Sequence, residues 1–177
     1  LFTGSENSPE SAYLIMQEEA AGKFIGKPKA TLMSTMLGIN YDVSSLRRIS
    51  RRAFVPSPRV DASFIAFLKK DEPVVGERDM GDFQDFITYG YVHLQRGRPV
   101  LDSFHDIFTA KQRAIIERES DLSQLGIGEL NITHWANLFE TFKRLVPDDR
   151  KALVRGSFTK LVREQGRLPK EHRTRRY

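Results

Sequence analysis

The feature that most constrains this chain is a pair of prolines one residue apart, Pro56 and Pro58, between an aromatic residue and an alternating segment. Each proline fixes its own φ at about −65° and disfavours helical backbone in the residue before it. We therefore predict that Val55 to Pro58 runs as a stiff extended segment that holds Phe54 at its start. A fixed ring beside cations suits stacking on a nucleobase. The alternative is that Phe54 fills a core, as most Phe side chains do.

The residues from Phe54 to Asp61 resemble the Phe-x-Pro-x-Pro-[Lys/Arg]-Val-[Asp/Glu/Asn] signature of the rRNA adenine dimethyltransferases. That superfamily contains the Erm macrolide-resistance methyltransferases and the KsgA/Dim1 ribosome-biogenesis enzymes. Residues 11–21 resemble the family segment that leads toward the signature. Residues 107–112 and 132–139 resemble the helical C-terminal domain of the Erm branch. The resemblance covers about residues 1–145.

The resemblance implies an α/β fold, in which the C-terminal portion of a Rossmann-like S-adenosylmethionine methyltransferase sheet is followed by a small all-helical domain. We expect residues 1–70 to form the sheet portion, residues 71–147 a helical RNA-binding domain, and residues 148–177 a basic, flexible tail.

The implied activity is adenine N6-(di)methylation of 23S rRNA in its domain V, with S-adenosyl-L-methionine as the cofactor. Such methylation gives resistance to macrolide, lincosamide and streptogramin B antibiotics. Two alternatives stay open: a KsgA/Dim1-type dimethyltransferase of small-subunit rRNA, and a non-catalytic RNA-binding module. The resemblance also implies a cytoplasmic protein that is monomeric at full length.

Two motifs of the family are not found in this sequence, which opens at Leu1. These are the catalytic Asn-Ile-Pro-Phe/Tyr motif and the glycine-rich loop that holds the cofactor. Gly126-Ile127-Gly128 follows a polar helical stretch rather than a strand, so it lacks the context of a dinucleotide-binding loop. Gly26-Lys27-Pro28 lacks the Ser or Thr of a phosphate loop. We therefore expect a fragment with no cofactor-binding residues, inactive by itself.

The candidate site residues are one aromatic and eight cations. By resemblance, Phe54 matches the aromatic that packs against the adenine once it has left its stack. The resemblance places the surrounding cations at the cleft between the two domains, where they would contact RNA, and Lys23 and Arg51 match positions that are often basic in the family. The candidate RNA-binding residues are Lys23, Lys27, Lys29, Arg47, Arg48, Arg51, Arg52 and Arg59.

Composition excludes several other classes of protein. The chain has no cysteine, so it has no disulfide and no cysteine-ligated zinc. Its four histidines are scattered without metal-ligand spacing, so we expect no metal site. No apolar run approaches the ~18 residues that span a membrane, so we expect no membrane association.

The positive charge is concentrated near the end of the sequence. Residues 150–177 hold ten Lys and Arg against two Glu, a charge of +8, which leaves −3 for residues 1–149 of a chain whose net charge is +5. A cationic segment on an acidic body suggests an RNA partner, although terminal charge runs are often only solvated.

Periodicity predicts the principal elements. An apolar run at residues 12–16 predicts a strand covered on both faces, as in a parallel sheet. Alternation over residues 60–68 predicts a central strand, and missing neighbours would leave one sheet edge unpaired. Helical spacing predicts helices over residues 83–94 and 135–146, the second with Thr133 as its N-cap and Trp135 in the core. Thr109 and Gln112 predict a capping box for a helix through about Glu119.

Overall fold

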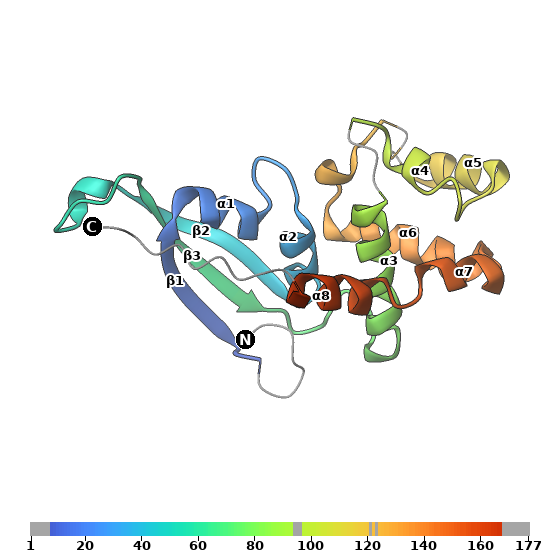
Figure 1. Cartoon of the computed structure of the whole chain (residues 1–177), viewed down its shortest axis with the longest axis horizontal. Coiled ribbons are helices and arrows are strands. Elements are labelled where there is room, and N and C mark those ends of the chain that lie inside the picture. Colours follow the sequence, from blue (N-terminus) through green and yellow to red (C-terminus); the bar gives the residue numbers. More distant parts are fainter. Residues whose placement is uncertain (1–7, 94–96, 121, 123, 168–177) are drawn as a thin grey trace.

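The computed structural model describes residues 8–93, 97–120, 122 and 124–167 (Figure 1). A sheet part comes first, with the elements β1 (Ser11–Gln17), α1 (Glu18–Ile25), α2 (Leu32–Leu37), β2 (Tyr41–Ile49), η1 (Arg51–Ala53) and β3 (Ala62–Lys69). A helical part follows, with η2 (Glu77–Asp79), α3 (Met80–Val92), α4 (Val100–Ser103), α5 (Ala110–Glu119), η3 (Ile127–Glu129), α6 (Ile132–Leu145), α7 (Asp148–Val154) and α8 (Ser157–Arg167).

The sheet has three strands in the order β1-β3-β2, and both pairings are antiparallel. The central strand predicted over residues 60–68 is confirmed as β3, which lies between β1 and β2. The prediction of a parallel, doubly covered strand at residues 12–16 is wrong, because Tyr13 and Ile15 of β1 are 54% and 57% exposed. A short apolar run specifies neither the direction of pairing nor the number of covered faces. In the described part of the chain β1 pairs with β3 alone, so it is an edge strand.

Helix α1 covers one face of this sheet. Its Ala21 lies in a core cluster with Tyr41 of β2 and with Ile65 and Phe67 of β3. The helix ends at Ile25 and is capped by Gly26, whose φ of +79° suits glycine because a Cβ would be strained there. The chain therefore turns sharply back toward α2.

Helix α2 begins at Leu32, four residues after Pro28. Thr31 is its N-cap, and the Thr31 hydroxyl accepts a hydrogen bond of 3.1 Å from the Ser34 amide. Pro28, which suits the first turn of a helix, lies instead in the preceding loop. Side chains of this helix also reach the helical part, where the hydroxyls of Thr35 and Tyr91 lie 2.8 Å apart.

An aromatic core holds the helical part together. Phe86 of α3 stacks on Phe104 with ring centroids 5.1 Å apart, and it meets the ring of Trp135 edge-on at 6.0 Å. The predicted burial of Trp135 is confirmed. The N-cap of α6 is Asn131 rather than Thr133, and the Asn131 side-chain oxygen accepts from the His134 amide at 2.9 Å. Both residues are good caps, so the composition of this segment did not decide between them.

The predicted flexible tail is wrong for residues 148–167, which form α7 and α8. Val154 of α7 is buried, and α8 packs against α3. The segment is rich in lysine and arginine, but it also contains apolar residues, of which Val154 is buried and Phe158 and Leu161 are half-buried. Residues 168–177 of the predicted tail lie outside the described residues.

Candidate nucleic-acid interface

The loop between β2 and β3 carries the proline-containing signature. The backbone carbonyl of Arg51 accepts hydrogen bonds from the Phe54 amide at 3.3 Å and from the Ser57 hydroxyl at 2.9 Å. These bonds fold the segment into consecutive bends, so the predicted straight, extended run is wrong. A proline restricts φ but leaves ψ free to turn the chain.

Phe54 lies half-buried at the start of these bends. It belongs to neither of the two core clusters. Among the described residues, no other aromatic ring is in contact with it. The loop backbone therefore positions the Phe54 ring, and the ring does not pack in either hydrophobic core. Its role as a stacking platform stays a prediction.

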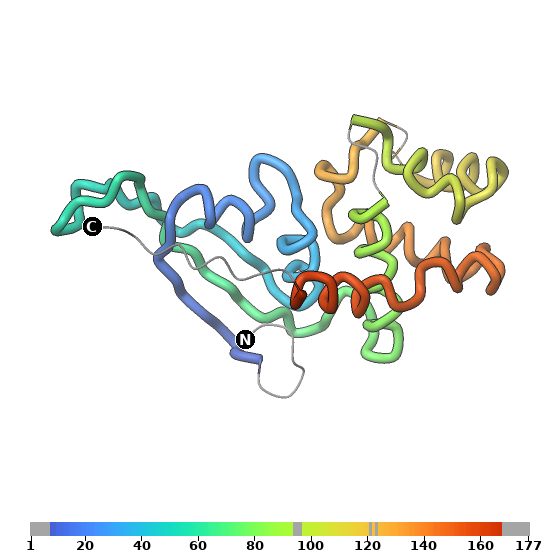
Figure 2. Tube along the Cα trace, in the orientation of Figure 1, coloured from blue at the N-terminus to red at the C-terminus, as the bar shows by residue number. Residues whose placement is uncertain are grey.

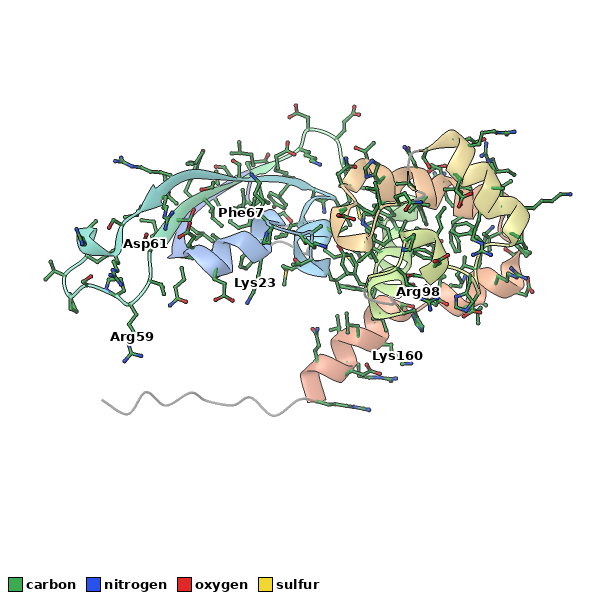
Figure 3. All side chains as sticks on the ribbon, turned by 90° about the horizontal axis from the view of Figure 1, so that it is seen from above. Lys23, Arg59, Asp61, Phe67, Arg98 and Lys160 are labelled. Carbon is green, nitrogen blue, oxygen red and sulfur yellow. The ribbon has the colours of Figure 1, made fainter. Side chains whose placement is uncertain are left out.

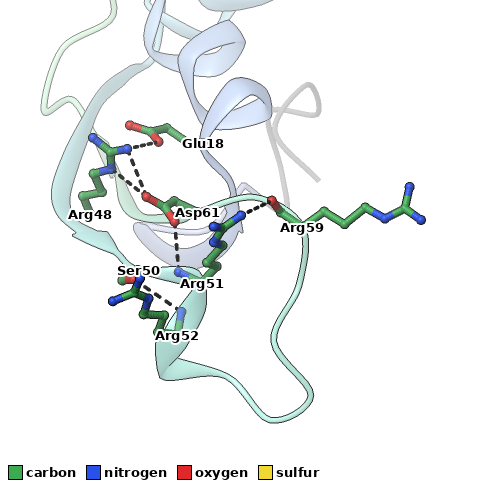
Figure 4. A network of polar contacts seen from close by, with 7 residues as sticks. All are labelled: Glu18, Arg48, Ser50, Arg51, Arg52, Arg59 and Asp61. Carbon is green, nitrogen blue, oxygen red and sulfur yellow. Dashed lines mark hydrogen bonds and ion pairs between the residues drawn. The ribbon is translucent and has the colours of Figure 1, made fainter.

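Asp61 ties the two ends of this loop together (Figure 4). One carboxylate oxygen accepts from the Arg51 amide at 3.0 Å. The other accepts from two nitrogens of the Arg48 guanidinium, at 3.0 and 3.2 Å. The same guanidinium lies 3.2 Å from the Glu18 carboxylate at the start of α1. The hydrogen bond from the Arg51 amide is the main reason why the pKa of Asp61 lies below its ordinary value of 3.8; desolvation opposes this shift, and the Arg48 guanidinium adds to it.

A β-bulge decides which arginine enters this network. The pairing of β2 with β3 slips by one residue between Ser45 and Arg47. An extra residue reverses the alternation of the side chains that follow it. Arg48 consequently lies on the face covered by α1, where it reaches Asp61 and Glu18, and Arg47 lies on the opposite face.

All eight predicted cations are exposed, but they differ in their partners. Arg48 is engaged as described, and Lys23 forms an ion pair of 3.1 Å with Glu19. The guanidinium of Arg51 donates to the backbone carbonyl of Arg59 at 3.2 Å. Of the eight predicted cations, those that form no ion pair with a described carboxylate are Lys27, Lys29, Arg47, Arg51, Arg52 and Arg59.

The structure does not bring all of these cations to one cleft. The β2–β3 loop, with Arg51, Arg52 and Arg59, lies at the end of the sheet that points away from the helical part (Figures 1 and 2). Strand β2 leaves the helical part and advances about 3.3 Å per residue, so its nine residues carry the loop some 25–30 Å away. The expectation that Phe54 and its cations face the cleft between the domains is therefore wrong for the loop.

Lys27 and Lys29 lie at the opposite end of α1 from the β2–β3 loop. They belong to the α1–α2 segment, and the backbone of Ala30 donates to the carbonyl of Gly128 in η3 at 2.7 Å. A groove of about 440 Å³ lies between this segment and the start of α6. Lys70 on its wall donates to the Gly38 carbonyl at 2.7 Å, so that ammonium stabilises the protein itself.

Sequence reasoning assigned a further group of cations to a flexible tail. Lys160, Arg163 and Arg167 lie on α8, where all three are exposed. The signal that could have identified them is their spacing of three and four residues, which places them on one helical face.

The described residues do not fit a bound S-adenosylmethionine. A cofactor loop needs glycines whose missing Cβ leaves room for the ligand. A Cβ at Gly128 would instead meet Lys29 at 3.1 Å, and one at Gly22 would meet the Lys27 carbonyl at 2.8 Å. These glycines accommodate the protein's own backbone and side chains.

Across residues 8–93, 97–120, 122 and 124–167, no three His, Asp or Glu side chains are grouped so that they could hold a metal ion. None of the helices described is long and apolar enough to cross a membrane.

Comparison with known proteins identifies related families. The family model described as ribosomal RNA adenine dimethylase matches residues 2–144. The mycinamicin-resistance protein MyrB of Micromonospora griseorubida is 23% identical over 76% of this chain and 43% of its own length. An rRNA adenine N-6-methyltransferase of Bacillus licheniformis is 22% identical over 79% of this chain and 50% of its own length. The chain thus spans about half the length of these curated relatives.

Other matches lie in a second branch or are structural. The ribosomal RNA small subunit methyltransferase A of Persephonella marina is 30% identical over 80 residues, which are 44% of this chain and 30% of its own length. The crystal structure of the 23S rRNA methyltransferase ErmE superposes with a TM-score of 0.66 at 17% identity, over 76% of this chain and 55% of that one. This structural match shows a shared fold.

Proposed function

Because the chain belongs to the ribosomal RNA adenine dimethylase family, we propose that it is the RNA-facing portion of an Erm-type 23S rRNA adenine N6-methyltransferase. The observation that carries this proposal is the family match over residues 2–144. The Erm branch is favoured because one relative is named for mycinamicin resistance and a structural neighbour is a 23S rRNA methyltransferase. The proposed outcome is resistance to macrolide, lincosamide and streptogramin B antibiotics, through methylation in domain V.

Phe54 is proposed to stack on the target adenine. An enzyme that modifies a base in a duplex must extrude it, at a cost of a few kcal/mol. Stacking on an aromatic ring recovers about 1–3 kcal/mol per base. Two features support this role: Phe54 is half-buried without an aromatic partner, and the exposed Arg52 and Arg59 flank it in the same loop. These arginines would contact the phosphates on either side of the base.

The family's S-adenosylmethionine supplies the methyl group, and the described residues of this chain do not fit it. We propose that the cofactor and the catalytic amide are held by polypeptide other than these 177 residues, which alone would be inactive. The complete enzyme is proposed to be cytoplasmic and monomeric, and to need neither a metal nor a membrane. This chain's own contribution is to bind and orient the RNA.

A KsgA-type activity on small-subunit rRNA is the second candidate. The match to the small subunit methyltransferase A of Persephonella marina supports it, with 30% identity over 80 residues. A non-catalytic RNA-binding module is the third candidate. It predicts salt-sensitive RNA binding that does not change when Phe54 is replaced by alanine.

A hybrid enzyme tests these candidates. The chain is joined to the cofactor-binding half of MyrB and incubated with labelled S-adenosylmethionine and either a 23S domain V hairpin or assembled 30S particles. We expect label in the adenine of the hairpin. Label in the 30S particles alone would favour the KsgA-type activity. The unfused chain is the control, and methyl transfer by it would contradict the proposed division of labour.

A further inference from the structure

Helix α8 is fixed to the rest of the protein by its first turn and by its apolar face. The Asp85 carboxylate of α3 accepts from the Gly156 amide at 2.6 Å and from the Phe158 amide at 2.9 Å. Phe158 and Leu161 lie on one side of the helix and are half-buried, and α8 packs against α3. The orientation of the helix about its own axis is therefore set, and so is the direction of its opposite face.

That opposite face carries three cations in one stripe. At 3.6 residues per turn, Lys160, Arg163 and Arg167 fall within about 60° of one another and span about 10 Å along the axis. All three are exposed, and none forms an ion pair with a described residue. Glu164 flanks the stripe but is likewise in no ion pair.

The stripe lies on the same side of the molecule as other cations. In Figure 3, α8 projects from the helical part, and Lys160, Lys23 and Arg59 all lie on the side toward which it projects. These residues come from α8, α1 and the β2–β3 loop, so basic groups are spread along the length of the molecule on this side. Such an extended basic surface matches the length of a nucleic-acid backbone better than that of a compact anion.

We propose that the stripe of Lys160, Arg163 and Arg167 on α8 is an accessory contact surface for the phosphate backbone of RNA. The inference rests on the proposed function in taking RNA as the partner, but it concerns residues 157–167, which lie beyond the family match that ends at residue 144. The contact is sequence-independent, because phosphates carry no base identity. An anionic membrane fits less well, because Phe158 and Leu161 are half-buried and Val162 is the one large apolar side chain that the described α8 exposes.

The salt dependence of RNA binding by the full 177-residue chain tests this surface. The triple variant K160A/R163A/R167A is compared with the parent on a 23S domain V hairpin and on a scrambled hairpin of equal length. Each phosphate contact contributes about 0.7 to the slope of log K against log salt on single-stranded RNA. We expect the slope of the triple variant to be shallower by about 2, with similar losses of affinity on both hairpins.

Matched variants separate charge from structure. K111A/R118A/R78A removes the same charge from exposed residues of α5 and η2 and is expected to leave the slope unchanged. K160R/R163K/R167K keeps the charge and is expected to keep the parental slope. An unchanged slope in the alanine triple would overturn the proposal, as would a parent that binds neither hairpin or binds phosphatidylserine vesicles instead. A failed methylation assay with a shallower slope would count against the proposed function alone.

Discussion

Some side chains of the β2–β3 loop stabilise the loop itself, and others remain available to contact a ligand. Arg48 and Asp61 join the loop to α1 through ion pairs and hydrogen bonds. Arg59 projects from the far side of the loop, and its backbone carbonyl is its contact with Arg51 (Figure 4). The sequence shows several arginines of equal character here, and only the bulge in β2 and the pairing geometry separate their roles.

Replacing Arg48 and Arg59 in turn should give opposite results. Arg48→Ala removes the partner of two carboxylates, so we expect a lower midpoint of thermal unfolding and little specific effect on RNA affinity. Arg59→Ala should leave the midpoint unchanged and reduce the salt slope of RNA binding by about 0.7. Differential scanning fluorimetry and fluorescence anisotropy measure the two quantities. If the two variants changed the unfolding midpoint and the salt slope equally, Arg48 and Arg59 would not have the separate roles assigned to them.

Asp61 should make stability depend on acidity. Its pKa is lowered in the folded state, so its contribution is present above the ordinary value of 3.8 and is lost as the pH falls through the lower, folded value. The parent should therefore exceed Asp61→Asn in stability by a constant margin above about pH 5, and the margin should shrink below about pH 4. Urea unfolding of both proteins from pH 7 to pH 3 measures this margin. A margin that grew on acidification would contradict the assigned network.

Among the elements, those with a strong period were predictable. The pattern predicted β3, α3, the capping box of α5 and most of α6, because each buries one face and the buried positions repeat. Antiparallel pairing of β1 was not predictable, since a short apolar run does not specify the direction of its neighbours. The bulge in β2 leaves a weak trace, a change of phase between Val43 and Leu46. The distance of the β2–β3 loop from the helical part depends on the tertiary arrangement of β2, which a local sequence pattern does not specify.

The contact between α3 and α6 depends on one glycine. A Cβ at Gly90 would lie 2.6 Å from the Trp135 ring and 2.8 Å from the Phe104 ring, so the two helices approach closely only without it. We expect Gly90→Ala to lower the free energy of unfolding by about 1–3 kcal/mol through overpacking. Gly81→Ala in the same helix is the control, because a Cβ there meets nothing within 4 Å.

The control should stabilise the chain by up to about 1 kcal/mol, since alanine favours helix more than glycine does. Urea unfolding measures both variants. Stabilisation by Gly90→Ala would show that α3 and α6 are not packed at this distance.

The whole molecule has one covered and one open sheet face. Ile65 faces α1 and is fully buried, whereas Tyr13, Ile15 and Leu68 expose about half of their surface on the other side. An open apolar face next to an unpaired strand edge favours association. In the described part of the chain β1 and β2 each pair with β3 alone, so both are edge strands, and the exposed Tyr13 and Ile15 lie on β1.

Ile15→Thr should reduce concentration-dependent association of the chain and change its unfolding free energy little. Ile65→Thr, on the covered face, should cost about 2–4 kcal/mol, because it removes buried methyl groups and buries a hydroxyl. Analytical ultracentrifugation and urea unfolding measure the two effects. Association that is unaffected by Ile15→Thr would place the contact elsewhere on the molecule.

The most direct test of the whole account is single-turnover methyl transfer to a 23S domain V hairpin by the hybrid enzyme, with Phe54 present or replaced. We expect the methyl group on the N6 of one adenine, a loss of about 5- to 150-fold in rate with Phe54→Ala, as loss of one stacked base implies, and near-parental transfer with Phe54→Tyr. Equal rates for Phe54 and alanine would contradict the claim that this ring receives the target base.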